Sequence, residues 1–197
     1  MIPQKLLFNR GATIRKYTKN QVIFFEGDMP GFYYQIVQGI VRMVNTNENG
    51  REFIQGIFGK GESFGEPVLL IDEPYPASRI ANEDSLLIKI RTEEFITILK
   101  EFPGIHFEFT KMIAKRLYNK SLIAKAISIN RPEQRVLSIF KILKDNYSIP
   151  GSLNYKVDLS RQQIADMIGF RVETVIRTIK RLEKLDIFKI QKGKIYL

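Results

Sequence analysis

Residues 159–185 read LSRQQIADMIGFRVETVIRTIKRLEKL, and this stretch constrains the fold more than any other part of the chain. Ser160 followed by Gln163 has the spacing of a capping box, which predicts the start of a helix. Gly169 predicts the end of that helix, because glycine readily adopts the left-handed conformation found there. A second helix is predicted from Val172, since apolar residues recur from there at spacings of three and four. Two helices joined by so short a turn indicate a helix-turn-helix.

The second of these helices carries charged residues on a face separate from its apolar stripe. Glu173, Arg177 and Lys180 lie about one turn apart on it. In a DNA-binding helix-turn-helix, the second helix enters the major groove. An ordinary helical hairpin with a solvated charged face is the alternative. The flanks favour DNA binding, because a short strand is predicted at 156–159 and two more at 187–197 around a Lys-Gly turn. Such an arrangement is that of a winged helix.

Charge is distributed unevenly along the chain. The 31 Lys and Arg exceed the 21 Asp and Glu, for a net charge of +10. Residues 131–197 alone hold 14 basic and 7 acidic side chains, a net charge of +7. A basic excess in the same third of the chain as the helix-turn-helix favours a polyanion partner, since neutralised phosphates release counterions. A solubility role for the positive charge is the alternative.

Several other classes of protein are excluded or not expected. The chain has no cysteine, which excludes disulfides, Cys-ligated zinc and Cys-ligated Fe–S clusters. No apolar run approaches the roughly 18 residues of a membrane span, and the first residues lack the apolar core of a signal peptide. We therefore expect a cytoplasmic protein without a membrane partner. His106 is the one histidine, and no nucleophile–base pair or phosphate-binding loop is present. The sequence predicts neither an enzyme nor a metal site.

The first hundred residues have the pattern of short strands separated by turns. Strands are predicted at 21–25, 32–37, 40–45, 51–58 and 85–90. Turn signals recur about every ten residues, which is typical of a β-sandwich or jelly roll.

A long helix is predicted to follow, at Ile105–Ile129. Its apolar band is broad enough to pack on the β-domain and to meet a second copy, although burial within one subunit is the alternative. The sequence at 130–133, Asn-Arg-Pro-Glu, then predicts a break that serves as a hinge before a further helix at 135–144.

These motifs resemble the Crp/Fnr family of bacterial transcription regulators. The C-terminal matches are IADMIG at 164–169, ETV at 173–175, Arg177, and RLEK at 181–184. FFEGD at 24–28, YYQIVQGIVRM at 33–43, NGRE at 49–52 and GESFGE at 61–66 resemble the cyclic-nucleotide-binding β-roll of the same family. The resemblance covers nearly the whole chain. It implies an α+β fold: an antiparallel β-roll (jelly roll) at 1–103, a dimerisation helix and hinge at 104–130, and a winged helix-turn-helix at 131–197.

The resemblance also implies a function, in which a homodimer binds a near-palindromic operator in double-stranded DNA and contacts RNA polymerase. Glu173 and Arg177 match the positions that read base pairs in the family. The sequence departs from the usual pattern of the family at two positions. Arg171 stands where Thr or Ser usually caps the helix, and Val172 stands where Arg is frequent. The full set of expected DNA-binding residues is Ser160, Arg161, Gln162, Arg171, Val172, Glu173, Thr174, Ile176, Arg177, Lys180 and Lys192.

In nucleotide-binding members of the family, a Gly-Glu pair before a short helix holds the cyclic phosphate and ribose, and a following Arg pairs with the phosphate. Gly65 and Glu66 match the pair, but Pro67 removes one N–H donor and residues 74–78 contain no Arg. We therefore do not expect cyclic AMP. The single histidine argues against haem and the absence of cysteine against an Fe–S cluster, so the effector stays open. A regulator that binds a cyclic nucleotide through a non-standard phosphate contact is the alternative. The candidate effector pocket comprises Gly65, Glu66, Tyr75, Arg79, Lys120 and Ser121.

Two rival classes of protein fit less well. A ligand receptor whose DNA-binding end has decayed is disfavoured by the retained Glu173 and Arg177. A cupin-type enzyme on the β-roll is disfavoured by the single histidine.

Overall fold

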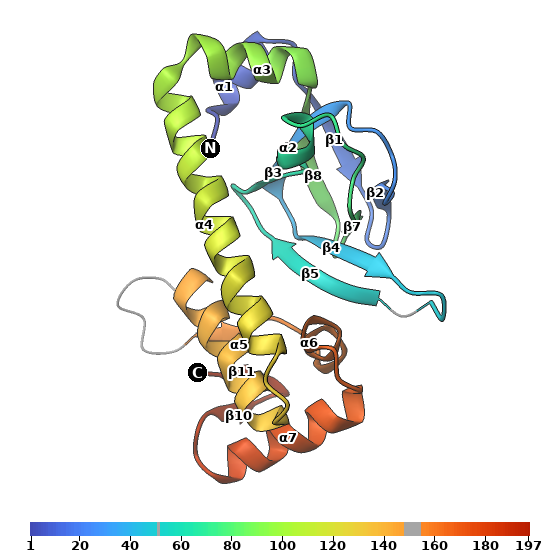
Figure 1. Ribbon diagram of the computed structural model, residues 1–197, viewed down its shortest axis with the longest axis vertical. Helices are drawn as coiled ribbons and strands as arrows, with labels where there is room; N and C mark the ends of the chain where they lie inside the picture. The colour runs from blue at the N-terminus through green and yellow to red at the C-terminus, as the bar shows by residue number, and fades with distance from the viewer. Residues whose placement is uncertain (51, 148–154) are drawn as a thin grey trace. The chain divides into compact units, whose positions relative to one another are not determined.

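The computed structural model describes residues 1–50, 52–147 and 155–197 (Figure 1). The chain divides into two compact units, Met1–Ala114 and Lys115–Leu197. The boundary falls inside one continuous helix, α4 (Pro103–Ile127), which begins and ends two residues earlier than predicted. Within the described ranges, no helix has the length and apolar character needed to cross a bilayer.

The first unit is built on two antiparallel sheets of four strands each, and the predicted jelly-roll architecture is confirmed. One sheet has the strand order β1-β8-β3-β6 and the other the order β2-β7-β4-β5. The strands are β1 (Thr13–Tyr17), β2 (Val22–Phe24), β3 (Phe32–Gln38), β4 (Val41–Thr46), β5 (Glu52–Phe58), β6 (Ser63–Phe64), β7 (Ser78–Ala81) and β8 (Ser85–Arg91).

The sequence predictions miss some elements of this unit. Strands β1, β6 and β7 and the helices α1 (Gln4–Asn9) and α3 (Thr92–Glu101) were not predicted. The five predicted strands correspond to β2, β3, β4, β5 and β8, with ends that differ by one residue at most. The first residue of the predicted strand 51–58, Arg51, lies outside the described residues.

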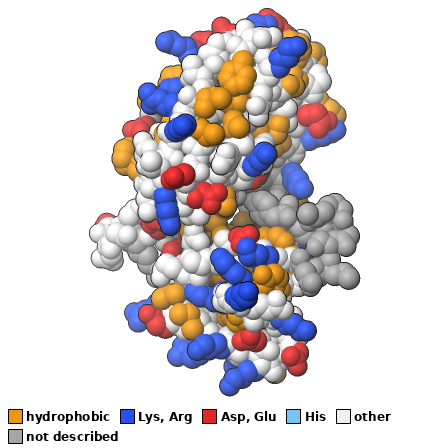
Figure 2. Space-filling model, turned by 180° about the vertical axis from the view of Figure 1, so that it is seen from behind, with side chains coloured by type: hydrophobic (Ala, Val, Ile, Leu, Met, Phe, Trp, Pro, Cys, Tyr) orange, Lys and Arg blue, Asp and Glu red, His pale blue; other side chains and the backbone are white. Residues whose placement is uncertain are grey.

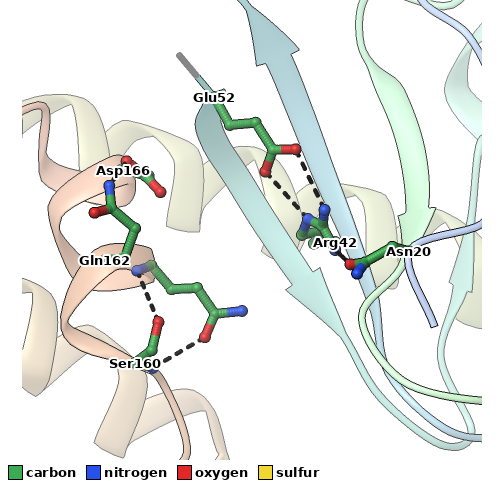
Figure 3. Close-up of polar contacts among 7 residues, drawn as sticks. Asn20, Arg42, Glu52, Ser160, Gln162 and Asp166 are labelled. Atoms are coloured by element: carbon green, nitrogen blue, oxygen red, sulfur yellow. Dashed lines mark hydrogen bonds and ion pairs between the residues drawn. The ribbon is translucent and has the colours of Figure 1, made fainter. Parts of the chain in front are cut away.

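Local contacts explain the turn between β3 and β4 and the link between β4 and its neighbours in the second sheet. Gly39, between β3 and β4, has a φ of +94°, and a Cβ there would lie 2.7 Å from the Cα of Ser85. Glycine is therefore required by both conformation and space. On the second sheet, Arg42 donates from Nε and Nη2 to the Glu52 carboxylate at 3.2 Å each and from Nη1 to Asn20 at 3.2 Å (Figure 3). This fork ties β4 to β5 and to the loop before β2.

The first unit has two apolar clusters, one inside the roll and one on its outer side. The inner cluster is rich in aromatic rings and includes Tyr17, Phe24, Tyr34, Phe64 and Tyr75. The outer cluster joins the sheet of β3 and β8 to α1, α3 and the beginning of α4. Phe95 of α3 stacks on Tyr33 and meets Phe109 of α4 edge to face. The start of α4 is thus part of the core of the first unit.

The second unit is a winged helix, as predicted. After the second part of α4, its elements are α5 (Pro132–Tyr147), β9 (Lys156–Val157), α6 (Arg161–Ile168), α7 (Val172–Lys184), β10 (Lys189–Gln191) and β11 (Lys194–Tyr196). The three strands form an antiparallel sheet in the order β10-β11-β9. Phe140 of α5 meets Phe188, just before β10, edge to face with ring centroids 5.7 Å apart. The three-part division at 104 and 131 stays a prediction, because contacts divide the chain once, within α4.

Candidate nucleic-acid interface

Helix α6 starts with the capping box that the sequence predicts. The Ser160 hydroxyl accepts a hydrogen bond from the Gln163 backbone N–H at 3.1 Å, and the Gln163 side chain accepts from the Ser160 N–H at 2.9 Å (Figure 3). Gly169 ends the helix with a φ of +71°. Both ends of α6 are therefore fixed by local features: the capping box satisfies two N–H groups at its start, and Gly169 forms the turn at its end.

Helix α7 buries one side and presents a charged side. Val175, Thr178, Ile179 and Leu182 are buried, whereas Glu173, Ile176, Arg177 and Lys180 are exposed. Arg171 occupies the N-cap position and makes no capping hydrogen bond with its side chain to any described residue. Arg171 is exposed, so its guanidinium lies at the solvent-facing start of the helix.

A buried arginine, which sequence reasoning did not identify, holds the turn between the two helices. Arg135 of α5 donates from Nε to the Ile129 carbonyl at 2.7 Å and from Nη1 to the Ile168 carbonyl at 2.9 Å. Its guanidinium also lies 4.2 Å from the centre of the Phe170 ring. Burial lowers the pKa of Arg135. The carbonyl of Ile168 belongs to the end of α6, where a helix leaves such groups without intrahelical partners.

The wing is a two-residue hairpin with a basic tip. Lys192 and Gly193 both have positive φ, +47° and +76°, as a type I′ turn requires. Arg161 of α6 donates to the Gly193 carbonyl at 3.4 Å, and burial lowers the pKa of Arg161. Arg161, one of the predicted DNA-binding residues, is half-buried against the wing, and its role in DNA binding stays a prediction. Two further exposed lysines of the wing, Lys189 and Lys194, were not among the predicted site residues.

The remaining predicted residues differ in accessibility. Gln162 is exposed and donates to the Asp166 carboxylate at 2.8 Å (Figure 3). Val172 and Thr174 are half-buried, so they offer less surface than Glu173 or Arg177. Figure 2 shows several Lys and Arg side chains over the lower part of the view, interspersed with acidic and apolar ones. Together, α7 and the wing form a basic surface with defined backbone geometry.

The interior of the β-roll holds four of the six candidate effector residues. Gly65 has a φ of +83° and precedes α2 (Glu66–Leu69). A Cβ on Gly65 would lie 3.3 Å from the Tyr75 ring, which stacks on Phe24 with centroids 3.6 Å apart. Glu66 is completely buried. The other two candidates, Lys120 and Ser121, lie on α4 in the second unit.

Arg79 points into the same aromatic interior. It is 6% exposed, and its guanidinium lies 4.8 Å from the centre of the Phe58 ring and 5.7 Å from that of Phe64. Burial raises the pKa of Tyr34 to about 12 and also raises the pKa of Tyr75. Both phenols are therefore neutral at physiological pH. No group of three or more His, Cys, Asp or Glu side chains suited to a metal occurs among the residues whose positions are described.

Each of the two units matches a known protein family. Residues 14–102 match the family model of a cyclic nucleotide-binding domain, and residues 134–197 match that of a Crp-like helix-turn-helix domain. The cyclic AMP receptor protein of Thermus thermophilus is 26% identical over 182 residues, which cover 92% of this chain and 82% of that protein. The global nitrogen regulator of a Nostoc species is 26% identical over 188 residues, covering 92% and 83%.

Solved structures share the fold. The c-di-GMP responsive global regulator CLP of Xanthomonas campestris is similar with a TM-score of 0.79 and 20% identity over 99% of both chains. A CooA variant of Carboxydothermus hydrogenoformans is similar with a TM-score of 0.82 and 18% identity, over 98% of this chain and 85% of that one. A lysophospholipase of Aspergillus niger is 30% identical over 129 residues, but the match covers 8% of that protein.

Proposed function

Because the chain belongs to the Crp/Fnr family of DNA-binding transcription regulators, we propose that it binds a near-palindromic operator as a homodimer. The observation that carries the proposal is the charged, exposed face of α7 beside the basic wing. An arginine such as Arg177 can bond to O6 and N7 of guanine, and a glutamate such as Glu173 can accept from N4 of cytosine. These two residues are the proposed readers of base pairs.

The other exposed polar residues are proposed to position the protein on the backbone of DNA. Arg171 at the entrance of α7 and Lys192 at the tip of the wing are exposed cations that can reach phosphates. Ser160, Gln162 and Lys180 extend this surface, with Thr174 and Val172 at its edge. Arg161 contributes by holding the wing turn through the Gly193 carbonyl.

The surface of α4 supports dimerisation through Ile105–Ile129. Leu117 is 67% exposed. Ala114, Leu117, Ser121 and Ala124 follow one another at spacings of three and four residues and so lie on one face of the helix. All four are exposed. Such a row of apolar and small residues is the type of seam along which two helices pack. Ile113 packs against the core of the first unit and is therefore not part of this row.

We propose that the interior of the β-roll does not bind cyclic AMP. In nucleotide-binding relatives the backbone at the Gly-Glu pair holds the phosphate, and here the Tyr75 ring lies directly against Gly65. Arg79 is buried among phenylalanine rings. We therefore propose an effector other than cyclic AMP, or none. The alternative, a regulator that binds a cyclic nucleotide through Arg79, requires Tyr75 to move off Gly65.

We further propose a cytoplasmic regulator without enzymatic activity that contacts RNA polymerase at its promoters. The relatives that span most of this chain are transcription regulators, which supports the first part. Contact with RNA polymerase is the corresponding proposal for the second part.

Selection of binding sites from random duplex DNA tests the proposed function. Two recognition helices related by a two-fold axis should select an inverted repeat with half-sites about one DNA turn, ~34 Å, apart. The double variant Arg177→Ala with Glu173→Ala serves as the control and should select no such repeat. Recovery of a single unsymmetrical half-site, or of no site by the wild-type protein, contradicts the proposal.

A further inference from the structure

One apolar side chain interrupts the charged face of α7. The exposed residues of this helix, all of which lie in the described part of the chain, are Glu173, Ile176, Arg177, Lys180, Arg181 and Lys184. Ile176 is 38% exposed. It lies one turn after Glu173 and directly before Arg177, in the half of the helix that would enter a major groove first.

Scattered exposed apolar residues are common on proteins and need no explanation by themselves. Ile176 differs in its surroundings, because the neighbours on its face are the proposed base-reading residues. The core side of α7 is already formed by Val175, Ile179 and Leu182. Alanine also favours a helix more than isoleucine does, so helix stability does not explain the residue.

From this position we infer that Ile176 reads thymine, through contact of its side chain with the C5-methyl group. This inference rests on the proposed function of α7. The edges of base pairs in the major groove carry hydrogen-bond donors and acceptors, and the thymine methyl is the apolar group among them. Burial of an apolar side chain against that methyl removes apolar surface of both partners from water.

The same contact discriminates against the other bases. An isoleucine side chain neither donates nor accepts a hydrogen bond. Placed over the edge of a G·C pair, it would exclude water from O6, N7 or N4 without replacing the lost bonds, which is unfavourable. A β-branched side chain also has one strongly preferred rotamer in a helix, so little side-chain freedom is lost on binding.

The neighbouring contacts give the position of the thymine in the operator. Ile176 adjoins Arg177 along the helix and lies one turn from Glu173. The half-site should therefore contain a T·A pair next to, or between, the pairs that Arg177 and Glu173 read.

Replacement of thymine by deoxyuridine in the selected operator tests the inference, because uracil lacks only the methyl group. The wild-type protein should lose affinity by about fourfold for each half-site in which the critical thymine is replaced, the value of one methyl-sized apolar group. Ile176→Ala should bind the thymine and uracil operators equally. Ile176→Val, the matched control that keeps a branched side chain, should retain most of the difference. Circular dichroism of both variants should match that of the wild type.

Two results overturn the inference in distinguishable ways. If the wild-type protein selects an inverted repeat but is insensitive to uracil at every thymine of it, Ile176 does not read thymine and the proposed function stands. If uracil weakens the wild type and Ile176→Ala to the same extent, another residue contacts the methyl group. If no operator is selected at all, the proposed function fails, and the inference fails with it.

Discussion

The ring of Tyr75 lies against Gly65, so that a Cβ on this glycine would approach the ring to 3.3 Å. Gly65 is the residue that matches the phosphate-binding glycine of nucleotide-binding relatives, and Tyr75 is 5% exposed. The Tyr75 ring thus packs beside the glycine that is expected to contact a cyclic phosphate.

Cyclic AMP should therefore bind weakly or not at all. A buried phosphate that lacks its cationic partner loses a contact worth a few kcal/mol, which moves a micromolar affinity toward millimolar. Isothermal titration calorimetry at nucleotide concentrations of about 0.1 mM should show no saturable heat. Micromolar binding that Arg79→Lys abolishes would instead support the alternative, a nucleotide switch with a non-standard phosphate contact.

Replacement of Leu117 by lysine should dissociate the dimer. The leucine is exposed in one chain, and an apolar seam between two chains would place the introduced charge in a buried environment. Light scattering at micromolar concentration should report a monomer, with circular dichroism unchanged. Leu70→Lys, at an exposed leucine of the β-roll, is the matched control and should remain dimeric. A monomeric wild-type protein under the same conditions would exclude this interface.

Base readers and phosphate contacts should respond differently to substitution. Arg177→Ala should reduce discrimination between the operator and its point variants by about 1–3 kcal/mol. Lys192→Ala should weaken binding to all sequences alike and reduce the salt dependence of log K by about one. Fluorescence anisotropy at several salt concentrations measures both quantities. An equal loss of discrimination in the two variants would contradict the assigned roles.

Arg135→Lys should destabilise the winged helix by about 1.5–3 kcal/mol. A lysine ammonium is a single point charge and cannot reproduce the fork that reaches the carbonyls of Ile129 and Ile168 while covering the Phe170 ring. Urea unfolding followed by circular dichroism measures the change. Arg131→Lys, at an exposed arginine before α5, is the control and should differ from wild type by less than about 0.5 kcal/mol. Equal stability of the two variants would show that the Arg135 contacts contribute little.

The elements that the sequence predicts well are those determined by neighbouring residues. The capping box of Ser160 and Gln163 and the turn at Gly169 involve groups a few residues apart, so their spacing alone identifies them. The same holds for the Lys192-Gly193 hairpin. The charged and apolar sides of α7 also follow directly from helical periodicity.

Elements that depend on distant partners were missed. Strand β1 is exposed along most of its length and exists through pairing with β8, about 70 residues further along the chain. Strand β7 is short and lies between two strands of distant sequence. Helix α3 has its buried residues at helical spacing, but its β-branched residues resemble those of a strand.

In the candidate site, too, the features set by neighbouring residues were predictable and those set by distant residues were not. The exposed residues of α7 were predicted because periodicity separates them from the core. The positions of Arg135 and Arg79 could not be predicted, since each depends on packing between segments far apart in the chain. Nothing in the sequence alone shows which arginine is buried and which meets solvent.

The tip of the wing keeps a lysine where the backbone favours another residue. Lys192 is held at a φ of +47°, a conformation that costs a residue with a Cβ roughly 1 kcal/mol and that asparagine or glycine tolerates better. Lys192→Asn would relieve this strain and would also remove an ammonium group from the surface proposed to meet DNA. Folding stability and DNA affinity therefore make opposite demands on this position. A variant selected for thermal stability alone would be expected to lose the lysine, and its affinity for DNA would decline as its melting temperature rose.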